Sequence, residues 1–353
     1  MRGGTSRGPF FRQADLPADS SLRDRVLLAV MGSPDHRQID GLGGAHPLTS
    51  KVGIVSRSVE PGVDIDFLFA QVVVDQAKVD TTPNCGNMLA AVVPFALETG
   101  LIEAQGETTT LRVLTRNTGM NCDITVCTPG GRVEYEGEAR IDGVPGTAAP
   151  ISINFLDTAG SVCASLLPTG SVRDMVDGIA VTCIDNGMPM VLLRAADLGC
   201  SGYESVDELN ADLALKSRLE ALRLKCGALM GLGEVAGKTY PKMCLIAPPR
   251  AGGSIATRTF IPHVCHDAIG VLQAVTVGTA CVLDGSVARD IAALAPGPVK
   301  TVSVEHPSGE FSVELELDPA DRQRVIRAAL LRTARLLMRG EVMIPSSIWN
   351  NTP

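Results

Sequence analysis

The sequence is poor in aromatic residues, which make up 3% of its 353 positions. Few aromatic rings leave little material for the stacking platforms on which proteins bind bases. The net charge of −8 also disfavours nucleic acid and acidic membrane surfaces as partners, since both attract basic patches. An anionic small molecule stays compatible with this charge, because a local pocket can be positive on an acidic protein.

No apolar run in the sequence reaches the length of about 20 residues that crosses a bilayer. No apolar signal region opens the chain, so we expect a cytoplasmic protein with no membrane partner. The ten cysteines are scattered and form no CxxC pair, a spacing that is poor for zinc, and we expect no metal. Without an export signal, most of these cysteines should be reduced thiols packed in the core.

The sequence does contain ample material for a core, with 45% apolar residues over a length that exceeds what one core usually serves. We therefore expect two lobes, residues 1–168 and 169–353, with the last strand or helix able to return to the first lobe. Strand patterns are frequent in both. Residues 63–74 alternate and then become continuously apolar, and residues 302–317 have the pattern of a hairpin around a Pro/Gly turn.

Two helical segments, residues 88–97 and 268–277, are nearly all apolar. A helix that is apolar all round is buried on every side. One such helix in each half predicts an α+β fold in which each lobe wraps a mixed sheet around a central helix. Pro94 should kink or end the first helix, because proline removes a helix hydrogen bond. A third helix, roughly residues 207–229, is charged on one side and is predicted to lie on the surface.

Two residues are candidates for proton chemistry. Lys51 lies in an apolar stretch of strand character, and burial favours the neutral amine that a general base needs. Cys85 precedes Gly86 and Asn87, which can open a helix whose free backbone N–H groups attract a carboxylate and stabilise a thiolate. The alternatives are an edge-strand lysine that reaches water and a packing cysteine. Together the two residues suggest an enzyme that moves protons on carbon.

Other polar positions are candidates for substrate binding. Residues 3–6, Gly-Gly-Thr-Ser, offer backbone N–H groups and two hydroxyls to an anion, without the spacing of a Walker motif. Residues 41–44 lack the GxGxxG spacing, so nucleotide binding is not expected. Asn186 follows a strand-like run and could face a pocket or lie in a plain turn. Arg258 and His263 precede the second apolar helix, where either could meet a carboxylate, although His263 could equally be structural.

The chain resembles a known family in several short motifs. Residues 85–87 and 186–189 resemble two local motifs of diaminopimelate epimerase, and the wider chain resembles the methylaconitate isomerase (PrpF-like) branch of that fold. Residues 1–6, 31–35, 37–41, 48–51 and 84–87 fit this branch. Within it, the likeness is greatest to the 4-oxalomesaconate tautomerases of gallate and protocatechuate breakdown, in residues 141–146, 167–170, 184–189, 260–263 and 305–310. The resemblance covers nearly the whole chain.

The resemblance implies two similar lobes of the diaminopimelate epimerase-like fold, with the active site in the cleft between them. It also implies a cofactor-independent 1,3-allylic isomerisation of 4-oxalomesaconate, a tricarboxylate. Lys51 and Cys85 fall on the family's catalytic lysine and cysteine, Lys51 as general base and Cys85 as acid or enolate stabiliser, although which group takes and which returns the proton stays open. The substrate-binding residues expected from the motifs and the resemblance are Gly4, Thr5, Ser6, Ser50, Gly86, Asn87, Asn186, Arg258, His263, Ile269 and Gly270. A homodimer is expected on symmetry alone.

Three departures from the family bear on these expectations. Epimerases of this fold use a second cysteine at the start of the second central helix, where this chain reads Asp-Ala-Ile-Gly at residues 267–270, which disfavours a two-thiol racemase. Arg7 stands where the family usually has lysine. Relatives also carry a short strand before residues 3–4, so we expect either a late start or a missing strand. The alternative functions are a 2-methylaconitate cis-trans isomerase or methylitaconate isomerase, an amino-acid epimerase, and a non-catalytic binding protein that retains the fold.

Overall fold

The computed structural model describes residues 1–320 and 325–349. They form two compact units, one of Met1–Leu156 with the described residues from Leu331 onward, and one of Asp157–Leu330. The lobe boundary predicted after residue 168 lies inside the second of these units, and the C-terminal segment is grouped with the first.

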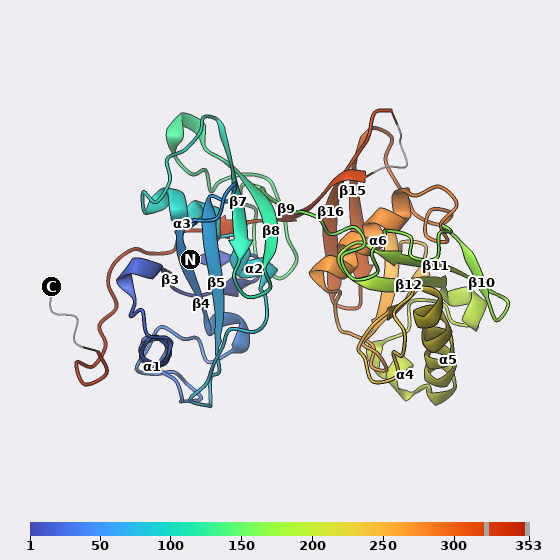
Figure 1. The fold of residues 1–353 in the computed structure, drawn as a ribbon, viewed down its shortest axis with the longest axis horizontal. Helices are drawn as coiled ribbons and strands as arrows, with labels where there is room; N and C mark the ends of the chain where they lie inside the picture. The colour runs from blue at the N-terminus through green and yellow to red at the C-terminus, as the bar shows by residue number, and fades with distance from the viewer. Residues whose placement is uncertain (321–324, 350–353) are drawn as a thin grey trace. The chain divides into compact units, whose positions relative to one another are not determined.

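The first unit is built on a mixed sheet of strand order β9-β8-β7-β5-β4-β3, with β6 paired to β5 (Figure 1). The pairs β3/β4 and β5/β7 are parallel, and the other pairs are antiparallel. A separate antiparallel sheet has the order β18-β1-β2. The elements are β1 (Arg2–Gly3), β2 (Ser6–Arg7), β3 (Phe10–Arg12), α1 (Ser20–Met31), β4 (Lys51–Arg57), β5 (Ile65–Val72), β6 (Val79–Asp80), α2 (Gly86–Leu89), α3 (Val92–Glu98), β7 (Thr108–Thr115), β8 (Met120–Cys127), β9 (Ile151–Phe155) and β18 (Ala334–Arg335).

The second unit has a mixed sheet of strand order β10-β11-β12-β13-β14-β15-β16-β17. Here β12/β13 and β14/β15 are the parallel pairs. The elements are β10 (Asp174–Val176), β11 (Ile179–Asp185), β12 (Pro189–Arg194), α4 (Val206–Ala211), α5 (Leu213–Leu229), β13 (Lys242–Ala247), β14 (Ile255–Phe260), α6 (Val271–Val282), β15 (Val299–His306), β16 (Gly309–Leu317) and β17 (Val325–Arg332), whose last two residues belong to the first unit.

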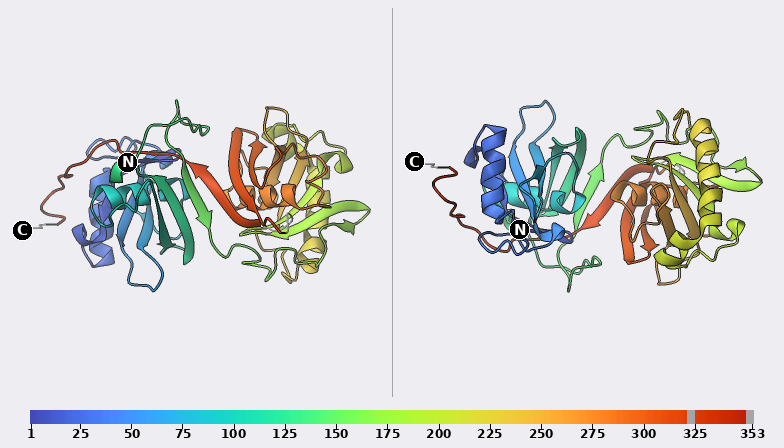
Figure 2. Two further views of the ribbon diagram at one scale, coloured as in Figure 1. Left: turned by 90° about the horizontal axis from the view of Figure 1, so that it is seen from above. Right: turned by 90° about the horizontal axis from the view of Figure 1, so that it is seen from below.

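Each sheet curls around a buried helix, as the apolar segments predicted. Helix α6 packs against β11 and β12 and also against β15 and β16, so strands from both parts of its sheet meet the same helix (Figure 1). Helix α3 likewise packs against β4 and β8 in the first unit. A second helix covers the outer side of each sheet. Helix α1 packs on β5 and β6, and α5 packs on β10 and β13 (Figure 2).

The helix predicted over residues 88–97 is two helices, α2 and α3, separated at Ala90 and Ala91. The break lies four residues before Pro94, where a continuous helix would need the missing proline N–H and would meet the proline ring. The predicted helix over 268–277 begins later, at Val271, and continues to Val282. The segment predicted over 207–229 is divided at Asp212, whose carboxylate accepts from the Leu215 N–H at 2.9 Å and caps α5.

The strand predictions are confirmed at both places. Residues 63–74 contain β5, and residues 302–317 lie within the β15–β16 hairpin, which starts at Val299 and closes at the pair His306 and Gly309. The fold class, α+β with a mixed sheet around a central helix in each half, is also confirmed.

Candidate active site

Lys51 and Cys85 lie in contact inside the first unit. Lys51 is the first residue of β4, and its Nζ lies 3.1 Å from the Ser6 Oγ and 3.4 Å from the Cys85 Sγ. Lys51 and Cys85 are each 8% exposed. The direction of the lysine follows from strand alternation, because Val52 and Ile54 are packed in the core cluster beneath α1, which leaves Lys51 on the inner face.

Cys85 is the N-cap residue of α2, with an extended backbone (φ −138°, ψ 96°). The helix opens at Gly86 and Asn87, as the sequence predicted, so the first backbone N–H groups have no acceptor within the helix. The Asn84 side chain holds the backbone before the thiol. Its Oδ1 accepts from the Cys85 N–H at 3.2 Å, and its Nδ2 donates to the hydroxyls of Thr115 and Thr118. The chain around the thiol is therefore held from two sides.

The turn between β1 and β2 lies directly against the start of α2. Gly4 has a positive φ of 51°, and a Cβ placed on it would lie 2.1 Å from the Asn87 Oδ1. The Asn87 Nδ2 in turn donates to the Thr5 Oγ1 at 2.9 Å. Glycine is needed at this position both for the backbone conformation and for the close approach. The turn thereby brings Ser6, Thr5 and the start of α2 together around the lysine.

Ser50 points away from the ammonium group and into a buried hydrogen-bond network. Its hydroxyl donates to the Val72 carbonyl and accepts from the Gln38 Nε2, both at 2.7 Å. Gln38 Nε2 also donates to the Ser33 Oγ, and the Gln38 Oε1 accepts from the Ala45 N–H. This network anchors the residue before Lys51. Neither Gln38 nor Asn84 was assigned a role from the sequence, although both lie in motifs that carried the resemblance.

In the second unit the structure brings Asn186, Ile269 and Gly270 to helix α6. Gly270 is the N-cap of α6, and Ile269 is buried before it. The Asn186 side chain makes hydrogen bonds inside the unit. Its Oδ1 accepts from the Thr158 Oγ1 at 2.6 Å, and its Nδ2 donates to the Thr279 Oγ1 at 2.8 Å.

Arg258 and His263 have their contacts elsewhere in the second unit. The Arg258 Nε donates to the Glu204 carbonyl, just before α4, at 2.7 Å. The His263 ring is half-exposed, with its Nδ1 3.6 Å from a Glu220 carboxylate oxygen on α5. Arg258 therefore faces the residue before α4, and His263 faces α5. In contrast, Asn186 contacts α6, and Gly270 is the N-cap of α6.

Comparison with known proteins places this arrangement in a family. The sequence model described as PrpF protein matches residues 1–345. The chain is 57% identical over 344 residues to the (4E)-oxalomesaconate Delta-isomerase of Novosphingobium sp. (strain KA1), covering 98% of this chain and 96% of that protein. It is 56% identical over 350 residues to the 4-oxalomesaconate tautomerase of Pseudomonas putida, covering 99% and 96%. The chain belongs to the PrpF family.

A solved structure supports the fold assignment for this PrpF protein. The crystal structure of methylitaconate-delta-isomerase matches with a TM-score of 0.86 and 33% sequence identity, over 99% of this chain and 96% of that one. The resemblance found in the sequence is confirmed at the level of the family and the fold. The relatives are named isomerases or tautomerases, so the protein is an isomerase, as predicted.

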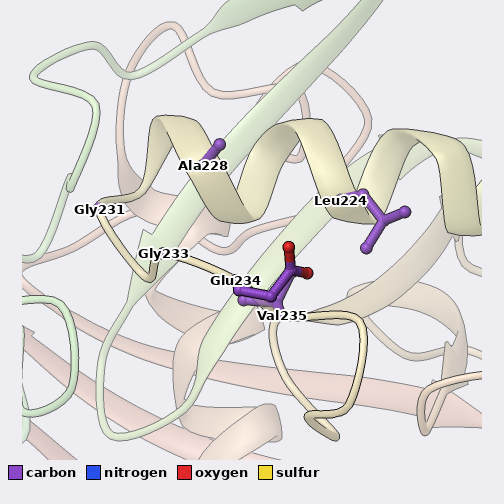
Figure 3. Close-up of a pocket in the computed structure, with 6 residues that line it drawn as sticks. All are labelled: Leu224, Ala228, Gly231, Gly233, Glu234 and Val235. Carbon is purple, nitrogen blue, oxygen red and sulfur yellow. The ribbon is translucent and has the colours of Figure 1, made fainter.

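A surface hollow in this PrpF protein belongs to the second unit, whereas the Lys51–Cys85 pair belongs to the first. It has a volume of about 540 Å³ near the end of α5 (Figure 3). It is lined by Leu224, Ala228, Gly231, Gly233, Glu234 and Val235. This lining offers one carboxylate and no paired base or thiol.

Among the residues that the structure describes, no helix combines the length and the apolarity that crossing a membrane needs. Within the same residues, no three His, Cys, Asp or Glu side chains gather closely enough to hold a metal ion.

Proposed function

We propose that this protein catalyses the 1,3-allylic isomerisation of 4-oxalomesaconate in the breakdown of gallate and protocatechuate, with Lys51 and Cys85 as its proton-transfer groups. The observation that carries the proposal is the contact of the buried Lys51 Nζ with the Cys85 Sγ at 3.4 Å. The two relatives that are 57% and 56% identical are named for this substrate, which supports the choice.

The reaction moves one proton and one double bond within the substrate. The neutral Lys51 amine takes a proton from the allylic carbon, and the electron pair of that C–H bond becomes part of a dienolate. The charge of the dienolate spreads onto the carbonyl and carboxylate oxygens. A proton then returns to the carbon two atoms away, from the Lys51 ammonium or from the Cys85 thiol. Nothing is oxidised or reduced, so the proposed reaction needs no cofactor, and general acid–base catalysis of this kind contributes about 10²–10⁴-fold to the rate.

The groups around the pair suit the developing negative charge. The backbone N–H groups of Gly86 and Asn87 lie in the first turn of α2, next to the thiol. The Ser6 hydroxyl lies 3.1 Å from the Lys51 Nζ and orients the ammonium. Preorganised donors at a forming oxyanion contribute about 10²–10³-fold each in other enzymes. We assign these groups to the dienolate oxygens and to the orientation of the lysine.

The test is deuterium exchange and turnover with purified protein in D₂O, followed by NMR and ultraviolet absorbance. The substrates are 4-oxalomesaconate, 2-methylaconitate and 3-methylitaconate. We expect turnover of 4-oxalomesaconate by the wild-type protein. Lys51→Met should lower kcat by at least about 10³-fold, and Cys85→Ser by about 10- to 100-fold. The matched controls in the first unit, Lys78→Met at an exposed lysine and Cys127→Ser at a half-buried cysteine, should retain wild-type rates.

Each result separates the candidate functions. Turnover of 2-methylaconitate or 3-methylitaconate without 4-oxalomesaconate would assign the protein to one of those isomerases, with the same catalytic pair. Full activity in Lys51→Met would remove the lysine from the mechanism. Absence of exchange with all three compounds would leave an isomerase of another unsaturated acid, or a binding protein that retains the fold.

A further inference from the structure

One edge of strand β5 is interrupted at Phe69. The other edge pairs with β4 along the whole strand. The interrupted edge serves two strands, since β7 pairs in parallel with residues 65–67 and β6 pairs antiparallel with residues 71–72. Hydrogen-bonded positions recur at every second residue of an antiparallel pair, so Phe69 is the next position after Gln71. Strand β6 ends at Asp80, however, and does not reach Phe69.

The side chain of Asn117 fills this gap. Asn117 lies in the turn between β7 and β8. Its Oδ1 accepts from the Phe69 N–H at 2.9 Å, and its Nδ2 donates to the Phe69 carbonyl at 2.9 Å and to the Thr81 carbonyl at 2.6 Å. Buried backbone groups need hydrogen-bond partners, and here one amide takes the place of the missing strand residue.

The two residues that Asn117 holds are neighbours of the catalytic pair. The Phe69 ring lies under the Lys51 Nζ, 5.6 Å from the ring centroid, which is within the range of a cation–π contact. Thr81 begins the segment of residues 81–84, which leads from β6 to Cys85. In the described chain, the backbone groups of this segment form no hydrogen bonds with other backbone groups, so side chains hold it in place.

The same turn also holds the other end of this segment. The Asn84 Nδ2 donates to the Thr115 and Thr118 hydroxyls, each at 3.2 Å, while the Asn84 Oδ1 accepts from the Cys85 N–H. The β7–β8 turn therefore fixes both the strand under the lysine and the segment before the thiol. The distance between the lysine and the thiol depends on this turn.

We propose that Asn117 is a positioning residue, which keeps the Lys51 Nζ and the Cys85 Sγ in contact by holding Phe69 and Thr81. It transfers no proton itself. Its effect on turnover rests on the proposed function of the pair. A displacement of about 1 Å between reacting groups costs about 10²-fold in rate, so the loss of Asn117 should lower kcat more than it changes substrate binding.

The kinetic test uses Asn117→Ala in the full-length protein with 4-oxalomesaconate. We expect kcat to fall by about 10- to 100-fold and KM to stay within about 3-fold. In the Cys85→Ser background the same substitution should lower kcat by less than about 3-fold, because the thiol that Asn117 positions is then missing. A role in general stability would not depend on the thiol.

Asn210→Ala is the matched control in the second unit. Asn210 is also half-buried, and its Oδ1 accepts from the Cys265 N–H at 2.8 Å. This variant loses a hydrogen bond of the same kind and should retain the wild-type kcat. Thr118→Val, at an exposed position of the turn, is the second variant if Asn117→Ala does not fold. It should lower kcat by about 3- to 10-fold, again only when Cys85 is present.

Hydrogen–deuterium exchange of the same proteins provides a measurement that needs no substrate. In Asn117→Ala we expect at least about 10-fold faster exchange in residues 81–89, with unchanged exchange in α1 of the same unit. In Asn210→Ala both regions should exchange as in the wild type. This pattern distinguishes a local release of the segment before the thiol from a general loss of structure.

The outcomes separate this inference from the proposed function. A folded Asn117→Ala variant with wild-type kcat overturns the positioning role. An equal loss of kcat with and without Cys85 overturns it too, as does unchanged exchange in residues 81–89 or an equal increase in α1. If the wild-type protein turns over none of the three substrates while exchange rises only in residues 81–89 of Asn117→Ala, the placement of the segment by Asn117 stands and the proposed function fails.

Discussion

The two units follow one plan of strands and helices but carry different side chains at the start of the central helix. In the first unit a thiol, Cys85, caps the helix and contacts Lys51. In the second unit Gly270 caps the helix, and Lys242, the first residue of β13 as Lys51 is of β4, has neither a thiol nor a carboxylate beside it in the described chain. The same corner of the fold therefore holds a lysine in contact with a thiol in one unit and a single buried lysine in the other. The comparison shows that the topology sets where such groups lie and the side chains set what they do.

The largest effect on stability is expected from the turn that faces the helix in the first unit. In Gly4→Ala the new Cβ would meet the Asn87 side chain at 2.1 Å, on a backbone with φ +51°. Strain and overpacking together should lower the free energy of unfolding by about 2–4 kcal/mol. Because the turn also holds Ser6 against Lys51, kcat/KM for 4-oxalomesaconate should fall by about 10²-fold. Urea denaturation and steady-state kinetics measure both effects.

Gly178→Ala provides the matched control for this substitution. Gly178 has a φ of +76° in the second unit, and a Cβ placed there meets nothing within 4 Å. Its backbone strain alone should lower the free energy of unfolding by about 1 kcal/mol, with unchanged kinetics. Equal losses of stability in the two variants would show that the Asn87 contact is unimportant.

The features of the two units that the sequence predicted are those that a short segment specifies by itself. The two apolar segments predicted both central helices, and the Gly-Asn pair after Cys85 predicted the helix start at Gly86. The contact between Lys51 and Cys85 was expected from the family resemblance, since spacing alone does not bring two residues 34 positions apart together. The repeat that equates Lys242 with Lys51 depends on strand pairing across the whole sheet, which no single segment encodes.

Side-chain direction was the feature that the sequence could not provide. Ser50 was expected to bind substrate, but its hydroxyl is engaged by Val72 and Gln38 below the strand. Arg258 and His263 are near α6 in the sequence. Strand alternation nevertheless directs Arg258 to the Glu204 carbonyl before α4, and the loop after β14 directs His263 to Glu220 on α5. Which face a residue occupies is decided by the register of the sheet, where a shift of one position reverses every side chain.

Two asparagines, Asn186 before β12 and Asn87 in α2, differ in their side-chain contacts, and a pair of variants tests this difference. Asn186 is 5% exposed and bridges Thr158 and Thr279, so Asn186→Ala should lower the free energy of unfolding by about 2–3 kcal/mol. Asn87 is half-buried and makes one side-chain hydrogen bond, to Thr5, so Asn87→Ala should lower it by only about 1 kcal/mol. Urea denaturation gives both values. Unchanged stability with a raised KM in Asn186→Ala would instead show that this side chain binds substrate.

The smallest effect concerns the pH dependence of stability at Lys242. The pKa of this lysine is lowered in the folded protein by burial, and next by Arg223, from its ordinary 10.5. The charged form therefore destabilises the fold at every pH below the folded pKa, and this penalty disappears as the pH rises toward 10.5. Lys242→Met should have a higher Tm than the wild type at pH 7, and the difference should shrink as the pH rises toward 10.5.

Differential scanning calorimetry of the wild type and of Lys242→Met across this pH range measures the difference. A lower Tm for Lys242→Met at pH 7 would mean that the lysine stabilises the fold of the second unit. Lys242 would then differ from Lys51 in having only a structural role, and the parallel between the two corners would be confined to their backbone.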